Sequence, residues 1–220
     1  MLTFVVPSIG RTTLIDTIES LQSQTVQQWK AIIVFDCVDP SADVLELIKS
    51  DHRITSHILT EKLGKYNNCA GEVRNYGIKF VETEWIAFVD DDDCLRPDYI
   101  ERFHESLEQL PELDCIIFRM IDSRRVLPSI PVIAEGNVGI SFCVKVESSR
   151  QKNIQFYSCG TEDLMYLKEL EYHGAKILIS NSITYFVRST PNKYHHEHIR
   201  LLEDMHDYRL INFEKNKVAP

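Results

Sequence analysis

The sequence predicts an α/β fold: a mixed, mostly parallel sheet flanked by helices, with a small antiparallel patch in the second half. Short apolar runs alternate with helix-like patterns from residue 2 to residue 121, which is typical of βαβ units. No linker rich in Pro, Gly or Ser divides the chain, and no internal repeat is found. A length of 220 residues suits one large domain. We therefore expect a single domain over residues 1–220.

Five strands are expected in the first part of the chain. They are apolar runs rich in β-branched and aromatic residues: Leu2–Val6, Trp29–Phe35, Ile54–Leu59, Trp85–Val89 and Leu113–Ile121. Apolar residues spaced three and four apart predict helices between them. These helices are expected through Leu14–Leu21, after the capping residue Ser41, over Glu72–Val81, and from Pro97 to Leu110.

The second part of the chain has shorter and less regular elements. Three β-like pieces make up the expected antiparallel patch: Val126–Leu127, Val132–Ala134 and Ile140–Val146. A helix over Glu162–Tyr172, ending at Gly174, is followed by strands at Lys176–Ile179 and Ile183–Val187. The tail from His195 to Ile211 is expected to be helical.

Charge and composition narrow the class of protein. The formal net charge is −9 at pH 7, and no basic cluster stands out, which argues against nucleic-acid binding. No apolar stretch approaches the ~20 residues of a transmembrane helix, and no secretory signal opens the chain. The six scattered cysteines lack zinc-type spacing. We therefore expect a soluble, cytoplasmic protein with reduced thiols.

Four consecutive aspartates, Asp90–Asp93, directly follow an apolar strand. Adjacent carboxylates repel one another unless something positive binds them, and oxygen ligands suit Mg²⁺ or Mn²⁺. Ligands of open α/β sheets bind at the carboxyl ends of the strands. We expect Pro7–Arg11, Asp36 and the acidic turn to converge there. The alternative is a solvated acidic loop that caps the helix near Pro97.

Four motifs in order make the chain resemble the family 2 glycosyltransferases. The first motif is a polar turn after the first strand, leading to a helix that ends in Ser-Leu-x-x-Gln-Thr. The second is an Arg-Asn-x-Gly-Ile helix, and the third is an Asp-x-Asp-Asp turn followed by Pro-Asp. The fourth is Gly-x-Glu-Asp at the start of a late helix. In this chain they occupy Val5–Thr25, Val73–Ile78, Asp90–Asp98 and Gly160–Asp163. The resemblance implies the GT-A fold and an inverting, metal-dependent transfer.

The resemblance also implies roles for individual residues. Asp163 would be the catalytic base, supported by Glu162, and Asp92, with Asp90, would bind Mn²⁺ or Mg²⁺. Asp36 would accept a hydrogen bond from the uracil ring, although its surroundings match the family pattern loosely. The expected nucleotide-binding set comprises Pro7, Ser8, Arg11, Asp36, Lys65, Asn68, Arg74, Asp90 and Asp91. Lys65 and Asn68 are included because their polar loop precedes the Arg74 helix; the alternative is that this loop is a flexible lid.

Two later features each have two possible assignments. Some members of the fold add a histidine to the metal, which points to His195, with His198 at helical spacing from it; ordinary solvated histidines are the alternative. Arg188, after the last apolar run, either meets a phosphate or forms a surface salt bridge.

The expected activity is transfer of a sugar from a nucleotide-diphosphate donor, UDP-linked by preference, to a hydroxyl of a glycan, lipid or small molecule. Residues 1–121 would bind the nucleotide sugar and residues 122–220 the acceptor. One alternative is a nucleotidyltransferase of related fold, although Pro7–Thr12 is not a glycine-rich phosphate loop. The other is a non-enzymatic module that binds a divalent cation, although the turn lacks EF-hand spacing.

Overall fold

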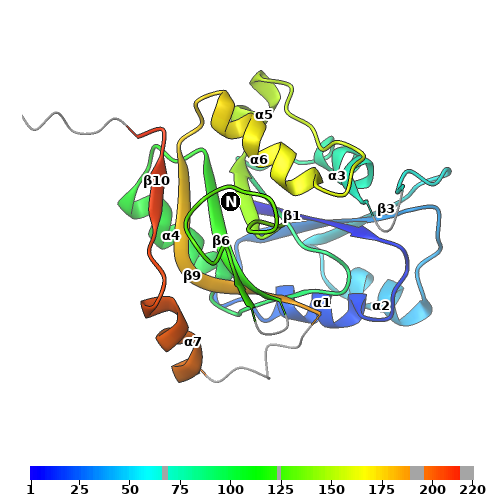
Figure 1. The fold of residues 1–220 in the computed structure, drawn as a ribbon. Helices are drawn as coiled ribbons and strands as arrows, with labels where there is room; N and C mark the ends of the chain where they lie inside the picture. The colour runs from blue at the N-terminus through cyan, green and yellow to red at the C-terminus, as the bar shows by residue number, and fades with distance from the viewer. Residues whose placement is uncertain (66–68, 123–124, 189–195, 214–220) are drawn as a thin grey trace, which may run out of the picture.

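A computed structural model describes residues 1–65, 69–122, 125–188 and 196–213. Of residues 196–198 it describes the backbone alone. Its centre is one mixed sheet with strand order β10-β9-β6-β8-β4-β1-β2-β3, to which β5 and β7 add at the side (Figure 1). Within the described part of the chain, no helix is both long enough and apolar enough to cross a membrane.

The parallel half of the sheet is built as expected. Strands β1 (Leu2–Ser8), β2 (Trp29–Phe35), β3 (Ile54–Ile58) and β4 (Trp85–Phe88) pair in parallel around β1. The β1 side chains are all buried, which explains why the strand is a continuous apolar run instead of an alternating one.

Helices cover both faces of this half. Helices α1 (Leu14–Gln22) and α2 (Ala42–Ser50) lie on the opposite side of β1 from α3 (Gly71–Ile78) and α6 (Glu162–Tyr172) (Figure 1). Ser41 caps α2 by accepting from the Val44 amide, as its sequence position predicts. Helix α4 (Tyr99–Gln109) packs Tyr99 against Phe4 of β1.

The antiparallel strands belong to the main sheet. Strand β8 (Phe142–Lys145) pairs antiparallel with both β4 and β6 (Cys115–Asp122), so it joins the two halves of the sheet. Two short strands, β5 (Cys94–Leu95) and β7 (Arg125–Leu127), pair antiparallel with β9 and β6. Helix α5 (Val146–Gln151), which the sequence did not predict, follows β8.

Three expectations for the second half are wrong. Residues 132–134 form no strand, because the Asn137 side chain donates to the Ile130 and Val132 carbonyls and holds them in a loop. The two late strands are one continuous strand, β9 (Ile177–Val187). The tail forms the helix α7 (His196–Asp204) but then a strand, β10 (Arg209–Ile211), which pairs with β9.

An aromatic cluster connects β4, β8 and α6. Phe156 and Tyr166 stack with ring centroids 4.4 Å apart, and Phe88 and Phe142 meet them edge-on or tilted. These four side chains are at most 2% exposed. Because Tyr166 and Phe156 flank the start of α6, this packing fixes that helix against the sheet.

Candidate active site

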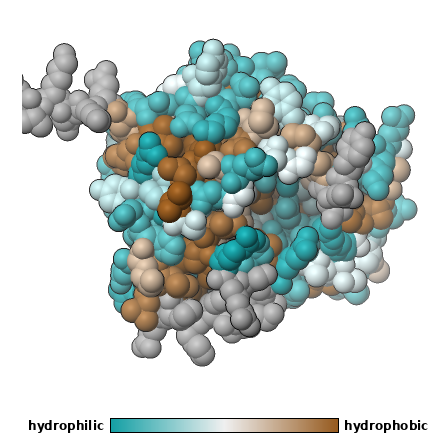
Figure 2. Space-filling view, viewed as in Figure 1, coloured by the Kyte–Doolittle hydropathy of each residue, from teal (hydrophilic) through white to brown (hydrophobic). Residues whose placement is uncertain are grey.

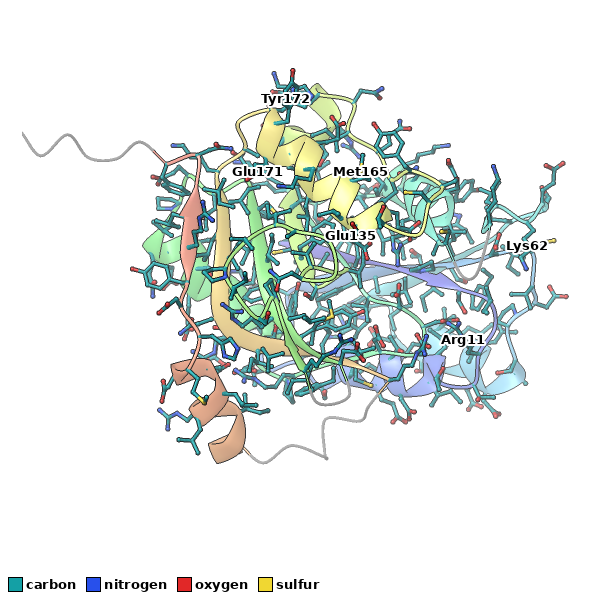
Figure 3. All side chains as sticks on the ribbon, viewed as in Figure 1. Arg11, Lys62, Glu135, Met165, Glu171 and Tyr172 are labelled. Atoms are coloured by element: carbon teal, nitrogen blue, oxygen red, sulfur yellow. The ribbon has the colours of Figure 1, made fainter. Side chains whose placement is uncertain are left out.

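The carboxyl ends of the parallel strands surround a cavity of about 260 Å³. The predicted nucleotide-binding residues that line it are Pro7, Ser8, Arg11, Asp36, Lys65, Asp90 and Asp91. Figure 3 shows Arg11 next to the start of α1, whereas Lys62 lies at the outer end of the segment that follows β3. Asp92 and Arg188 also line the cavity. The expected convergence of the strand ends is therefore present.

Each aspartate of the acidic turn has its own cationic or hydrogen-bonding partner. Asp90 accepts from Arg74 at 2.5 Å, and Asp91 accepts from Arg11 at 2.5 Å. Asp92 lies 3.2 Å from Nε of Arg188. Three arginines therefore supply positive charge to three of the four carboxylates, and the expected metal at this turn stays a prediction.

Asp93 is the exception, since its partners are largely uncharged. Its carboxylate accepts from the Tyr185 hydroxyl at 2.6 Å and from the Arg188 amide at 2.8 Å. Burial, reinforced by Asp90, raises the pKa of Asp93 to about 7. This contact connects the acidic turn to the end of β9. No motif in the sequence predicts the role of Tyr185.

Asp91 organises the loop after β1. It is 2% exposed and accepts from the Ser8 hydroxyl at 2.8 Å, the Ile9 amide at 3.0 Å and Arg11. Thr13 donates to its backbone carbonyl. These bonds give Asp91 a scaffolding role, and its predicted contact with a nucleotide stays a prediction.

Arg74 is at the centre of a buried carboxylate cluster. It is 3% exposed and pairs with Glu162 and Asp90, while Oδ1 of Asp163 lies 3.9 Å from its Nη1. Burial opposes the charge, but Asp90, Asp163 and Glu162 together raise the pKa of Arg74 above its ordinary value. Arg74 therefore stays cationic and links the acidic turn to α6.

Glu162 fixes the start of α6 to the start of α3. Its two carboxylate oxygens accept from the Ala70 amide at 3.2 Å and the Gly71 amide at 2.8 Å, in addition to Arg74. Only glycine fits at position 71, since a Cβ there would lie 2.8 Å from Glu162 and 2.9 Å from the Tyr157 carbonyl. Glu162 thus supports the site as a positioning residue.

Asp163 differs from its neighbour in having spare proton-accepting capacity. Its Oδ1 is buried and has no hydrogen-bond partner within the described chain, while the side chain as a whole is 27% exposed. Burial raises its pKa to about 7, with Asp90 and Glu162 adding to the rise and Arg74 opposing it. Such a carboxylate exchanges protons near neutral pH, as a general base must.

Asp36 holds the segment that lines the far side of the cavity. It accepts from the Leu63 amide at 2.6 Å and the Gly64 amide at 3.0 Å. A Cβ at Gly64 would lie 2.6 Å from Asp36, so this close approach requires glycine. The sequence predicted the position of Asp36 correctly but not this role.

Some predicted residues lie outside the described part of the chain. These are Asn68 and His195, and the side chains of His196 and His198. No group of three or more His, Cys, Asp or Glu side chains suited to a metal occurs among the residues whose positions the structure gives. Asp90 and Asp92 supply two hard oxygen ligands, and Mg²⁺ or Mn²⁺ commonly completes such a set with water and substrate phosphates. The residues present fit that arrangement.

Comparison with known proteins identifies the family. The sequence model of glycosyl transferase family 2 matches residues 3–160, well over half of the chain. The chain belongs to this family. As a family 2 glycosyltransferase it is an enzyme, so neither the nucleotidyltransferase nor the cation-binding module is retained.

Two curated relatives match parts of this glycosyltransferase. An uncharacterized glycosyltransferase of Haemophilus influenzae is 32% identical over 117 residues, which is 53% of this chain and 37% of the relative. The succinoglycan biosynthesis protein ExoO of Rhizobium meliloti is 32% identical over 104 residues, covering 47% of this chain and 28% of ExoO. The matched part of the chain thus spans only 37% and 28% of the length of these two relatives.

Solved structures confirm the GT-A fold of this glycosyltransferase. The crystal structure of S. aureus TarS 1–349 superposes with a TM-score of 0.70 at 18% identity, over 91% of this chain and 64% of that one. A TarS 1–349 complex with UDP-GlcNAc gives 0.71 at 17% identity, over 90% and 60%. The mannosyltransferase PcManGT of Pyrobaculum calidifontis, in complex with GDP-Man and Mn²⁺, gives 0.62 at 13% identity, over 88% and 58%.

Proposed function

We propose that this glycosyltransferase moves a sugar from a UDP-sugar to a hydroxyl acceptor, with inversion at the anomeric carbon. The observation that carries the proposal is Asp163, whose buried Oδ1 has no hydrogen-bond partner among the described residues, beside the cluster that borders a strand-end cavity. Complexes of TarS with UDP-GlcNAc and of PcManGT with GDP-Man support a nucleotide-sugar donor. The match to the UDP complex favours uracil over guanine.

The cavity suits a nucleoside diphosphate. Arg11 and Lys65 supply positive charge on its wall, and backbone turns at both the β1 loop and the Lys62–Lys65 segment leave room for a ligand between them. Asp36 would meet the base with lone pairs that the Leu63 and Gly64 amides leave free. Asp90 would accept from a ribose or sugar hydroxyl.

Asp92 and Asp90 would hold a divalent ion, Mn²⁺ or Mg²⁺. When bound, such an ion supplies positive charge that stabilises the leaving diphosphate. The PcManGT complex with Mn²⁺ supports this assignment. His195 remains a proposed additional ligand outside the described residues.

The chain's own groups account for proton movement. Asp163 takes the proton from the acceptor hydroxyl while the oxygen of that hydroxyl forms a bond to the anomeric carbon. The bond from that carbon to the diphosphate oxygen breaks, and its electron pair leaves with the diphosphate. Arg74 and Glu162 keep Asp163 in place, because they connect α6 with the acidic turn.

The acceptor would approach from the second half of the chain. Apolar side chains gather over β6, β9 and β10 on the face shown in Figure 2, framed by hydrophilic ones. Exposed Ile130 lies in the loop that precedes β8. Sugar rings and lipid chains both contact such surfaces, so a glycan or lipid acceptor fits this half.

A donor screen tests the proposal. UDP-, GDP- and dTDP-sugars would be assayed for Mn²⁺-dependent hydrolysis and for transfer to hydroxyl acceptors. Asp92→Ala is expected to abolish both reactions, whereas Asp163→Asn should remove transfer and leave UDP binding within about twofold. Full transfer by the Asp163→Asn variant would disprove the base assignment.

A further inference from the structure

The three arginines around the acidic turn are not equally bound. Arg74 is 3% exposed and held by carboxylates on two elements, and Arg11 is 28% exposed and bonded to the buried Asp91. Arg188 is 72% exposed, and among the described residues its side chain contacts Asp92, with Nε 3.2 Å from the carboxylate. Its contact is therefore the one that can be exchanged at least cost.

The backbone of Arg188 is nevertheless fixed. Its amide donates to Asp93 at 2.8 Å, and its φ of +47° lies in the left-handed region that non-glycine residues rarely adopt. Tyr185, three residues earlier on β9, donates to the same Asp93. This anchoring holds the start of the Arg188 side chain at the cavity wall, while the rest of the side chain is largely exposed.

We propose that the Arg188 guanidinium holds the cation position at Asp92 before the donor binds and exchanges with the divalent ion when the donor binds. This inference rests on the proposed donor and metal. A divalent ion at Asp92 repels the guanidinium, because both are cations that approach the same carboxylate. The incoming diphosphate offers Arg188 new anionic partners within the same cavity.

The exchange has a signature that a purely structural role lacks. Without nucleotide, Arg188 competes with the ion, so its removal should tighten ion binding. With the ion and UDP both present, Arg188 contacts the diphosphate, so its removal should weaken UDP binding. A variant that merely loosened the site would weaken both.

The first effect is measured by titrating the whole chain with Mn²⁺. The loss of the electron paramagnetic resonance signal of the free ion reports how much Mn²⁺ is bound. We expect Arg188→Ala to bind Mn²⁺ about two- to fivefold more tightly than the wild type, the range of an exposed ion pair. Calorimetry at saturating Mn²⁺ should show roughly tenfold weaker UDP binding by the same variant. Alanine meets the same backbone constraint as arginine at this φ, so folding should be preserved.

Two further variants make the test decisive. Arg188→Lys keeps a positive charge and should fall between the wild type and Arg188→Ala in both measurements. Arg102→Ala removes an equal charge from α4, where Arg102 pairs with Asp98 and Glu105, and should change neither. Unchanged or weaker Mn²⁺ binding by Arg188→Ala overturns the inference alone, whereas a wild type that binds neither Mn²⁺ nor UDP overturns the proposed function as well.

Discussion

At the scale of single residues, Glu162 and Asp163 show how adjacent carboxylates acquire different roles. Glu162 uses both oxygens to bind Arg74 and two backbone amides, whereas Asp163 keeps one buried oxygen without a hydrogen bond. The sequence predicted the pair because of its Gly-x-Glu-Asp context. The division of labour depends on Arg74 and Gly71, which approach from α3.

The buried carboxylate of Asp163 should reduce stability. Its folded pKa of about 7 lies above the usual 3.8, so the folded state binds the proton more tightly and the destabilisation grows as pH rises from about 4 to 7. We expect Asp163→Asn to raise the free energy of unfolding by about 1 kcal/mol at pH 8 and by little at pH 4, after allowance for partial exposure. Urea unfolding at both pH values measures this difference; equal changes at the two would contradict the assigned environment.

Removing the charge of Glu162 should have the opposite effect. Glu162→Gln leaves the buried Arg74 guanidinium without its closest carboxylate, which is expected to cost about 3 kcal/mol. Glu171→Gln on the same helix removes only an exposed pair with Lys168 and should cost less than about 0.5 kcal/mol. Urea unfolding at pH 8 compares the two variants. Similar losses in the free energy of unfolding would show that the Arg74–Glu162 pair contributes no more to stability than the exposed pair.

At the scale of elements, the starts of α3 and α6 must touch for the site to form. The Gly71 position leaves no space for a side chain, because a Cβ would lie within 3 Å of Glu162, Phe156 and the Tyr157 carbonyl. Sequence analysis expected the α3 helix to begin at Glu72, and the structure begins it at Gly71. It had no means of relating that glycine to α6.

Gly71→Ala should therefore separate the two helices. We expect about 2 kcal/mol of destabilisation, measured by thermal unfolding, together with loss of transfer activity as Asp163 moves from Arg74. Gly160→Ala is the matched control, since a Cβ there meets nothing within 4 Å and should be nearly neutral. If both substitutions behaved alike, close packing of α3 on α6 would not explain the glycine.

At the scale of the whole molecule, the proposed donor and acceptor halves are interwoven. Strand β8, from the second half, pairs with β4 of the first, and Arg188 from the second half lines the proposed donor cavity. The proposed boundary at residue 121 is therefore not a boundary in space. It separates chain segments, and the cavity draws on both.

This interweaving predicts one cooperative unfolding transition. Both tryptophans, Trp29 and Trp85, lie in the first half, so fluorescence reports on that half while circular dichroism reports on the whole. Phe142→Ala, in β8, should destabilise by about 3–5 kcal/mol and shift both signals together. A shift in circular dichroism without a matching shift in fluorescence would show that the halves unfold separately.

The sequence by itself determined the local structure of the parallel half and the residues that line the cavity. Those features follow from short-range patterns: apolar runs, helical spacing, caps and polar residues at strand ends. Only the tertiary structure decided which charges meet. Arg11, Arg74 and Arg188 come from three distant segments, and their pairing with consecutive aspartates depends on through-space electrostatics that no local pattern contains. The insertion of β8 and the pairing of β10 were decided in the same way, because strand partners far apart in the chain are selected by packing of the whole sheet.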